Sequence, residues 1–181
     1  MIDIAILNWL HSHTIPCSIP VLQFISYSTT FFSIAITLMV LISAFVKKSK
    51  AIMKQFFILA AVLIFVLIVS QGLKAIIFRE RPFVTHPSIE KLSEAGSSSF
   101  PSGHTLEAFA IAAVLSFLFS KKKITIPVYI WAALVAYSRM ALGVHYPSDV
   151  LAGIIIGTFI GWIIPCIVSR FFSSGKINNP Q

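Results

Sequence analysis

Residues 138–149 read SRMALGVHYPSD and connect two long apolar runs. Pro147 suits the first turn of a new helix, because its missing N–H has no intrahelical partner there. His145 then lies just outside a helix N-terminus, and Asp149 lies in the first turn, where the helix dipole favours a carboxylate. An aspartate placed in this way can accept the proton of one ring nitrogen and leave the other nitrogen as a lone-pair donor. The stretch predicts an oriented, reactive histidine, although a turn histidine beside a capping aspartate is the simpler interpretation of this stretch alone.

The composition is that of a membrane protein. The chain has 181 residues, of which 57% are hydrophobic and 11% are charged, whereas about a quarter of the residues of a soluble domain are charged. The net charge of +8 does not indicate a nucleic-acid partner, because the lysines lie at the ends of apolar runs, where they act as topology signals. We expect one compact domain in contact with membrane lipids and no nucleic acid.

Five apolar runs have about the length that crosses a bilayer, the third only with part of its flanks: 21–46, 55–78, 104–120, 124–142 and 149–172. Residues 1–19 alternate apolar and polar side chains around Trp9 and are broken near Pro16 and Pro20, which indicates an interfacial amphipathic helix. The sequence therefore predicts an all-α integral membrane bundle of about five transmembrane helices. Its parts are the N-terminal helix at 1–19, one transmembrane domain at 20–172 and a polar tail at 173–181.

Charge predicts how this bundle is oriented. Nine of the 14 basic residues lie on one side of it: Lys47, Lys48, Lys50, Lys54, Lys121, Lys122, Lys123, Arg170 and Lys176. The other five, with all acidic residues and all histidines, lie towards the opposite side. Because cytoplasmic loops carry the excess of lysine and arginine, we expect the lysine loops and the C-terminus in the cytoplasm and the histidines outside.

Glycines recur at every fourth position of the last apolar run, at 153, 157 and 161. A face of small residues lets another helix approach closely. We interpret this face as packing within the chain, with a homodimer interface as the less favoured alternative.

Two further stretches carry polar residues next to apolar runs. In the first, Lys74 and Arg81 are seven residues apart, which would place them on one helix face, while Pro82, which follows directly, pushes Arg81 out of the helix. A lysine inside an apolar run is costly and indicates function, although Lys74 is near enough to the end of its run to extend into water. Function and this structural interpretation are about equally supported for Lys74 alone.

The second stretch is Pro101-Ser102-Gly103-His104, directly before the third apolar run. Gly103 lets backbone approach a ligand, and a helix starting here presents free N–H groups to an anion. Ser102 can add a hydroxyl group. A simple capping turn explains Pro-Ser-Gly equally well, but it does not explain His104.

The predicted topology brings the three stretches to the same membrane face. Lys74, Arg81 and Arg139 would supply positive charge, and the turn before the third run would supply backbone N–H groups. Two histidines complete the set. Such a collection of cations and N–H donors fits a phosphate better than any other anion.

Together the stretches resemble the tripartite signature of the type-2 phosphatidic acid phosphatases, a membrane lipid-phosphatase superfamily that shares its site with the vanadium haloperoxidases. The matching residues, in order, are Lys74, Arg81, Pro82, Pro101, Ser102, Gly103, His104, Ser138, Arg139, His145 and Asp149. The resemblance extends over roughly residues 55–165, and the N-terminal helix and the tail are less diagnostic.

The resemblance implies a role for each site residue. His145 would attack phosphorus and form a phosphohistidine, Asp149 would orient it, and His104 would protonate the leaving oxygen. Five residues would bind the phosphate oxygens: Lys74, Arg81, Ser102, Gly103 and Arg139. We expect no metal and no cofactor, because these cations take the place that magnesium has in other phosphoryl-transfer sites.

The substrate would be a lipid phosphate that reaches the site from the bilayer. Related bacterial enzymes act on undecaprenyl diphosphate, phosphatidylglycerophosphate or lipid A, and we favour undecaprenyl diphosphate, because the chain is compact and the site faces outward. The minimal architecture suggests a bacterial inner membrane. A phosphate-binding transporter subunit and a vanadate-dependent haloperoxidase are the alternatives from other classes. A transporter subunit would have charges spread through several spans, and haloperoxidases of this kind are soluble proteins.

Overall fold

The structure, a computed structural model, describes residues 2–96 and 98–174, and side chains as far as Arg170. The described residues form helices and no strand, which confirms the all-α prediction. In chain order the elements are α1 (Ile2–Ser12), the 3-10 turn η1 (Pro16–Ser18), α2 (Ile19–Val46), α3 (Lys50–Ile76), α4 (Pro82–Thr85), α5 (Gly103–Phe119), α6 (Lys122–Ala141) and α7 (Pro147–Ser174).

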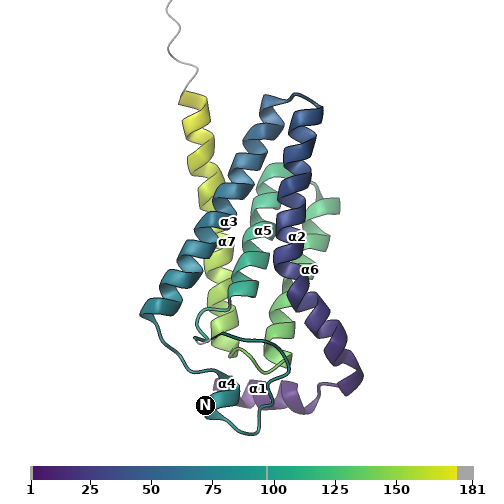
Figure 1. Ribbon diagram of the computed structural model, residues 1–181, viewed down its shortest axis with the longest axis vertical. Coiled ribbons are helices and arrows are strands. Elements are labelled where there is room, and N and C mark those ends of the chain that lie inside the picture. The colour runs from purple at the N-terminus through teal and green to yellow at the C-terminus, as the bar shows by residue number, and fades with distance from the viewer. Residues whose placement is uncertain (1, 97, 175–181) are drawn as a thin grey trace, which may run out of the picture.

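Four of the described helices are long and apolar enough to cross a membrane: α2 with its preceding turn, α3, α6 and α7. The fifth predicted span, α5, has 17 residues and is about 26 Å long at 1.5 Å per residue. It lies in the middle of the bundle (Figure 1), and its side chains from Leu106 to Leu115 are mostly buried. The outer helices instead expose large apolar side chains such as Phe24 and Phe31, which suits contact with lipid.

The N-terminal segment differs from the prediction. The helix expected within residues 1–19 ends already at Ser12, and the expected break near Pro16 is present, because Pro16 begins a separate 3-10 turn. Pro20 does not break a helix, because it lies in the first turn of α2, where its missing N–H has no intrahelical partner. At the other end α7 continues to Ser174. The first two residues of the predicted tail at 173–181 are therefore helical, and residues 175–181 lie outside the described part.

The two lysine loops and the polar connectors lie at opposite ends of the bundle (Figure 1). The α2–α3 and α5–α6 turns are at one end. The α3–α5 connector and the α6–α7 turn are at the other, and α1 lies across that end. The three polar stretches identified in the sequence therefore lie at one end of the molecule.

The glycine face of α7 packs against α5, which confirms the packing interpretation. A Cβ atom on Gly157 would lie 2.2 Å from the carbonyl oxygen of Leu106, and one on Gly161 would lie 2.5 Å from that of Ala110. A Cβ atom on Gly153 would lie 2.9 Å from the carbonyl oxygen of Ser102. These contacts are with backbone, so the glycines set how closely α5 and α7 approach and are not free to form a dimer interface.

We expect Gly157→Ala to destabilise the bundle by about 1–3 kcal/mol, the usual effect of overpacking. The added methyl group must push the α5 backbone away. Gly72→Ala is the matched control, because a Cβ atom on this α3 glycine meets nothing within 4 Å, and alanine is the better helix former by about 1 kcal/mol. Thermal unfolding of both variants in detergent measures the difference, and an unchanged midpoint for Gly157→Ala would contradict the close approach.

Candidate active site

His145 lies in a tight turn that the sequence pattern predicted correctly. The turn follows the end of α6, with Gly143 at φ +72°, and α7 begins at Pro147 with Asp149 in its first turn. The connector packs directly on the turn: a Cβ atom on Gly143 would lie 2.4 Å from the carbonyl oxygen of Glu90. Glycine is therefore required here for both its positive φ and its lack of a side chain.

His145 is buried and presents one ring nitrogen to Arg81. Its side chain is 2% exposed, and its Nε2 lies 3.3 Å from Nη1 of Arg81. Because a guanidinium only donates hydrogen bonds, Nε2 is the acceptor and the imidazole proton is on Nδ1. Burial lowers the pKa of His145 to about 4, with Arg139 and Arg81 acting in the same direction and Asp149 opposing them. His145 is therefore neutral at pH 7, with a lone pair on Nε2.

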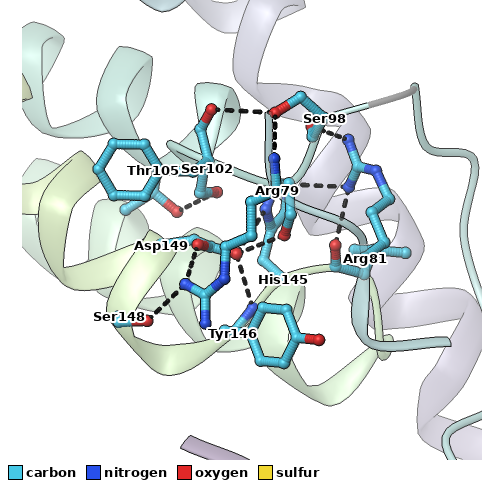
Figure 2. Close-up of polar contacts among 12 residues, drawn as sticks. Arg79, Arg81, Ser98, Ser102, Thr105, His145, Tyr146, Ser148 and Asp149 are labelled. Carbon is cyan, nitrogen blue, oxygen red and sulfur yellow. Dashed lines mark hydrogen bonds and ion pairs between the residues drawn. The ribbon is translucent and has the colours of Figure 1, made fainter. Parts of the chain in front are cut away.

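Asp149 faces the other ring nitrogen of His145, but its oxygens are occupied by other donors. Its Oδ2 lies 3.7 Å from Nδ1 of His145, which exceeds a hydrogen-bond length. Oδ2 accepts hydrogen bonds from the backbone N–H of Tyr146, at 2.9 Å, and from the hydroxyl of Ser99, and Oδ1 accepts one from Arg79 at 2.6 Å (Figure 2). The expected direct hydrogen bond between the two is not formed in this structure, and Nδ1 has no hydrogen-bond partner among the described residues.

Arg81 reaches the site from the connector and not from a helix. The expectation that Pro82 pushes Arg81 out of the helix is confirmed, because the Arg81 backbone is extended directly before Pro82. The helix face shared with Lys74 is not formed, because α3 already ends at Ile76 and the backbone at Ile77 is no longer helical. The Arg81 guanidinium donates to the carbonyl oxygens of Val144 at 2.7 Å and Gly96 at 2.6 Å. It also donates to the carbonyl oxygen of Ser98 at 3.0 Å (Figure 2). These contacts fix the side chain without neutralising its charge.

Arg139 comes from the last turn of α6 and is 1% exposed. Its Nη1 donates to the hydroxyl of Ser26 on α2, and its Nε has no hydrogen-bond partner among the described residues. Lys74, Arg81 and Arg139 each lie more than 4 Å from every carboxylate of the described residues. Three cations without an ion-paired carboxylate give this end of the bundle the chemistry to bind an anion.

The Pro101–His104 stretch forms the start of α5 and faces Lys74. A Cβ atom on Gly103 would lie 3.2 Å from Oγ of Ser70 and 3.8 Å from Nζ of Lys74, so the start of α5 packs closely against this part of α3. The backbone N–H of Ser102 donates to the carbonyl oxygen of Asp149 at 3.1 Å, which ties this turn to the start of α7. The Ser102 hydroxyl pairs with that of Thr105 at 2.9 Å (Figure 2).

A cavity of about 380 Å³ extends from these residues between α2, α3 and α5. Lys74, Gly103 and His104 line one part of it together with the polar residues Thr30, Ser70, Gln71 and Glu107, and the apolar side chains of Ile34, Leu63, Val66 and Leu67 line the rest. The position of Lys74 in this wall favours the functional interpretation over simple extension into water.

The sequence interpretation missed three residues that contact Asp149 or its partners: Arg79, Ser99 and Asp3. Arg79 lies within the first polar stretch, two residues before Arg81, and Ser99 lies in the serine run before Pro101. Both residues could therefore have been found from the sequence, because they lie in or next to the stretches that carry the other site residues. No sequence pattern pointed to Asp3, because its contact with Arg79 joins residues 76 positions apart.

Comparison with known proteins identifies the family of this chain. The family model of the PAP2 superfamily matches residues 55–173. The chain is 36% identical over 97 residues to the undecaprenyl-diphosphatase BcrC of Bacillus subtilis, and the aligned part covers 54% of this chain and 49% of that protein. It is 35% identical over 101 residues to a lipid A 4'-phosphatase of Bacteroides thetaiotaomicron, with 56% and 45% covered. The chain thus spans about half the length of the curated relatives it matches.

Solved structures share the fold. The crystal structure of Aquifex aeolicus LpxE superposes with a TM-score of 0.73 at 25% identity, covering 91% of this chain and 94% of that one. A phosphatidylglycerolphosphate phosphatase of Bacillus subtilis superposes with a TM-score of 0.70 at 23% identity, covering 98% and 87%. The family model matches well over half of the chain. The chain is therefore a multi-pass membrane protein that belongs to the PAP2 superfamily.

Proposed function

We propose that this protein is a membrane phosphatase that hydrolyses a lipid phosphate or diphosphate through a phosphohistidine on His145. The observation that carries the proposal is the set of three cations without acidic partners around a buried, neutral histidine. Phosphoryl transfer depends mainly on positioning and on stabilising charge at the phosphate oxygens. Lys74, Arg81 and Arg139, with the N–H groups at Gly103 and the Ser102 hydroxyl, would supply that stabilisation without a metal or cofactor.

The reaction has two steps. In the first, the Nε2 lone pair of His145 attacks phosphorus while the bond from phosphorus to the leaving oxygen breaks and His104 gives that oxygen a proton. In the second, water attacks the phosphohistidine, His104 accepts its proton, and inorganic phosphate leaves with the P–N bond broken. Asp149 stabilises the imidazole when it carries positive charge.

The cavity between α2, α3 and α5 supports a lipid substrate. It joins Lys74 and His104 to a wall of apolar side chains within the length of the spans, so that a phosphate can lie beside these two residues while its acyl or prenyl chain stays in an apolar environment. A soluble phosphate ester would gain nothing from this wall.

We favour undecaprenyl diphosphate as the substrate and undecaprenyl phosphate as the product. Similarity to a protein named undecaprenyl-diphosphatase supports this choice, and so does the inferred outward orientation, which rests on the lysine loops at the far end of the bundle. The C-terminus would then lie in the cytoplasm and the site would face the exterior of a bacterial inner membrane. Phosphatidylglycerophosphate, phosphatidic acid and lipid A are the alternative substrates.

Phosphate release by the purified protein in detergent, with EDTA present, tests the proposal. The panel consists of undecaprenyl diphosphate, phosphatidylglycerophosphate, phosphatidic acid and lipid A, each measured with wild type and with His145→Ala. We expect release from one lipid well above the others and none from the variant. Release only when divalent metal is added would contradict the metal-free mechanism. No release from any lipid would favour the transporter alternative, in which the site binds phosphate without cleaving it.

A further inference from the structure

Arg79 is a cation at the site that neither the signature nor the proposed mechanism uses. Its Nη1 donates to Oδ1 of Asp149 at 2.6 Å and to the hydroxyl of Ser148 at 2.7 Å (Figure 2). Its guanidinium carbon lies 3.9 Å from the centre of the Tyr146 ring, a distance typical of a cation–π contact. Arg79 therefore contacts the residues on both sides of Pro147, at the start of α7.

These contacts determine how the carboxylate of Asp149 lies. Its side chain is fully buried, and burying a carboxylate without a partner is costly. Arg79 supplies the charge-assisted bond at one oxygen, while the hydroxyl of Ser99 and the N–H of Tyr146 hold the other. With both oxygens held, Oδ2 faces Nδ1 of His145.

Arg79 is itself held by the N-terminal helix. Its Nη2 donates to Oδ2 of Asp3 at 2.9 Å. Asp3 also accepts hydrogen bonds from the backbone N–H of Ser148, at 3.1 Å, and from the Ser148 hydroxyl. A carboxylate at this place is further stabilised by the N-terminal end of α7. Asp3, Arg79 and Asp149 thus form a continuous acid–base–acid chain from α1 to the site.

Packing keeps α1 in this position. Leu7 is fully buried against Ile89 and Tyr146, the same tyrosine that lies beneath Arg79. On the opposite side Ile2 and Trp9 are 77% and 60% exposed, which suits a helix lying at a membrane surface with its apolar face in the lipid.

We propose that Arg79 is a positioning residue for Asp149, and that Asp3 on α1 holds Arg79 in place for this role. The inference rests on the proposed function, in which Asp149 orients His145. It links the N-terminal helix to catalysis, because the position of α1 affects the position of His145 through the ion pairs of Arg79 with Asp3 and with Asp149. Arg79 does not contact the phosphate in this scheme, so its loss affects the rate of the chemical step and not substrate binding.

The test compares kcat and KM of Arg79→Met, Arg79→Lys, Asp3→Asn and the double variant Asp3→Asn/Arg79→Met. We expect Arg79→Met to lower kcat by about 10- to 100-fold, the range seen when a group that orients a metal-bound histidine is removed, with KM within about twofold of wild type. Arg79→Lys keeps a cation near Asp149 and should recover part of the rate. Asp3→Asn should have a smaller effect that disappears in the Arg79→Met background, because coupled residues are not additive.

Lys91→Met is the matched control, since Lys91 forms an exposed ion pair with Glu94 on the connector; we expect it to leave kcat unchanged. A normal kcat for a folded Arg79→Met protein would overturn the proposal. So would a loss confined to KM, which would make Arg79 a phosphate ligand. Additive effects of the Asp3 and Arg79 changes would remove α1 from the scheme.

A second readout does not depend on turnover. The imidazole of His145 can be titrated by NMR in histidine-labelled protein, with the His145→Ala spectrum identifying its signal. The charged groups that act on it are Arg81, Arg139 and Asp149, with Arg79 behind Asp149, and His104 also interacts with it electrostatically. Removing the Arg79 charge leaves Asp149 less neutralised, so the pKa of His145 should rise in Arg79→Met and stay unchanged in Lys91→Met. An unchanged pKa would count against the proposal even if no lipid is hydrolysed, which keeps its failure separate from a failure of the proposed function.

Discussion

Replacing His145 with alanine is expected to reduce phosphate release by about 10⁴-fold or more, the order of loss that follows removal of a catalytic nucleophile. The side chain is buried, with Nε2 next to Arg81 and without a proton. We expect no replacement nucleophile, because His104, the other candidate histidine, is proposed to act as the acid on the leaving-group side.

The same variant tests the intermediate. When wild type is mixed with 32P-labelled substrate and quenched in base, we expect protein-bound phosphate that is released by mild acid, as a phosphorus–nitrogen bond requires. His145→Ala should show none. His13→Ala is the matched control, because His13 is exposed at the end of α1, and it should keep both turnover and label. A label that survives in His145→Ala would assign the nucleophile to another residue.

The sequence predicted the arrangement of the bundle well because two simple physical constraints determine it. Apolar runs of bilayer length must be helices, and the lysine loops indicate which ends lie together. Within the site, the position of Asp149 one turn after His145 was also predictable, since both belong to one turn and its following helix, although the expected hydrogen bond between them is not formed. Local spacing and helix geometry are enough for such pairs.

The prediction failed where long-range contacts override local pattern. The apolar run continues to Phe78, but α3 ends at Ile76, because the backbone of Arg79 pairs with the connector: its carbonyl oxygen accepts from the N–H of Ser99 at 2.8 Å. This early end moves Arg81 off the helix and turns the Arg79 side chain towards Asp149. The two side chains that bind Asp149, Ser99 and Arg79, come from 50 and 70 positions away, and no spacing rule finds such pairs.

His104→Ala is expected to have an effect that depends on the leaving group. A general acid contributes about 10²- to 10⁴-fold when the leaving oxygen needs a proton. We therefore expect a loss of that size with phosphatidic acid, whose leaving group is an alkoxide. With p-nitrophenyl phosphate, whose leaving group is stable as an anion, formation of the phosphohistidine should be nearly as fast as in wild type.

The second step separates the two roles of His104. If His104 also activates the water, then His104→Ala should release one equivalent of p-nitrophenolate rapidly and then turn over slowly, because the phosphohistidine accumulates. Stopped-flow absorbance measures this burst directly. Glu107→Gln is the control, since Glu107 lines the same cavity on the same helix and its change should not alter the ratio of the two substrates. Equal slowing of both substrates without a burst would mean that His104 binds the phosphate and that the proton comes from another group. That outcome would not affect the assignment of His145 as the nucleophile, but it would require a different proton donor on the leaving-group side. Lys74, which lines the same cavity, is the next candidate.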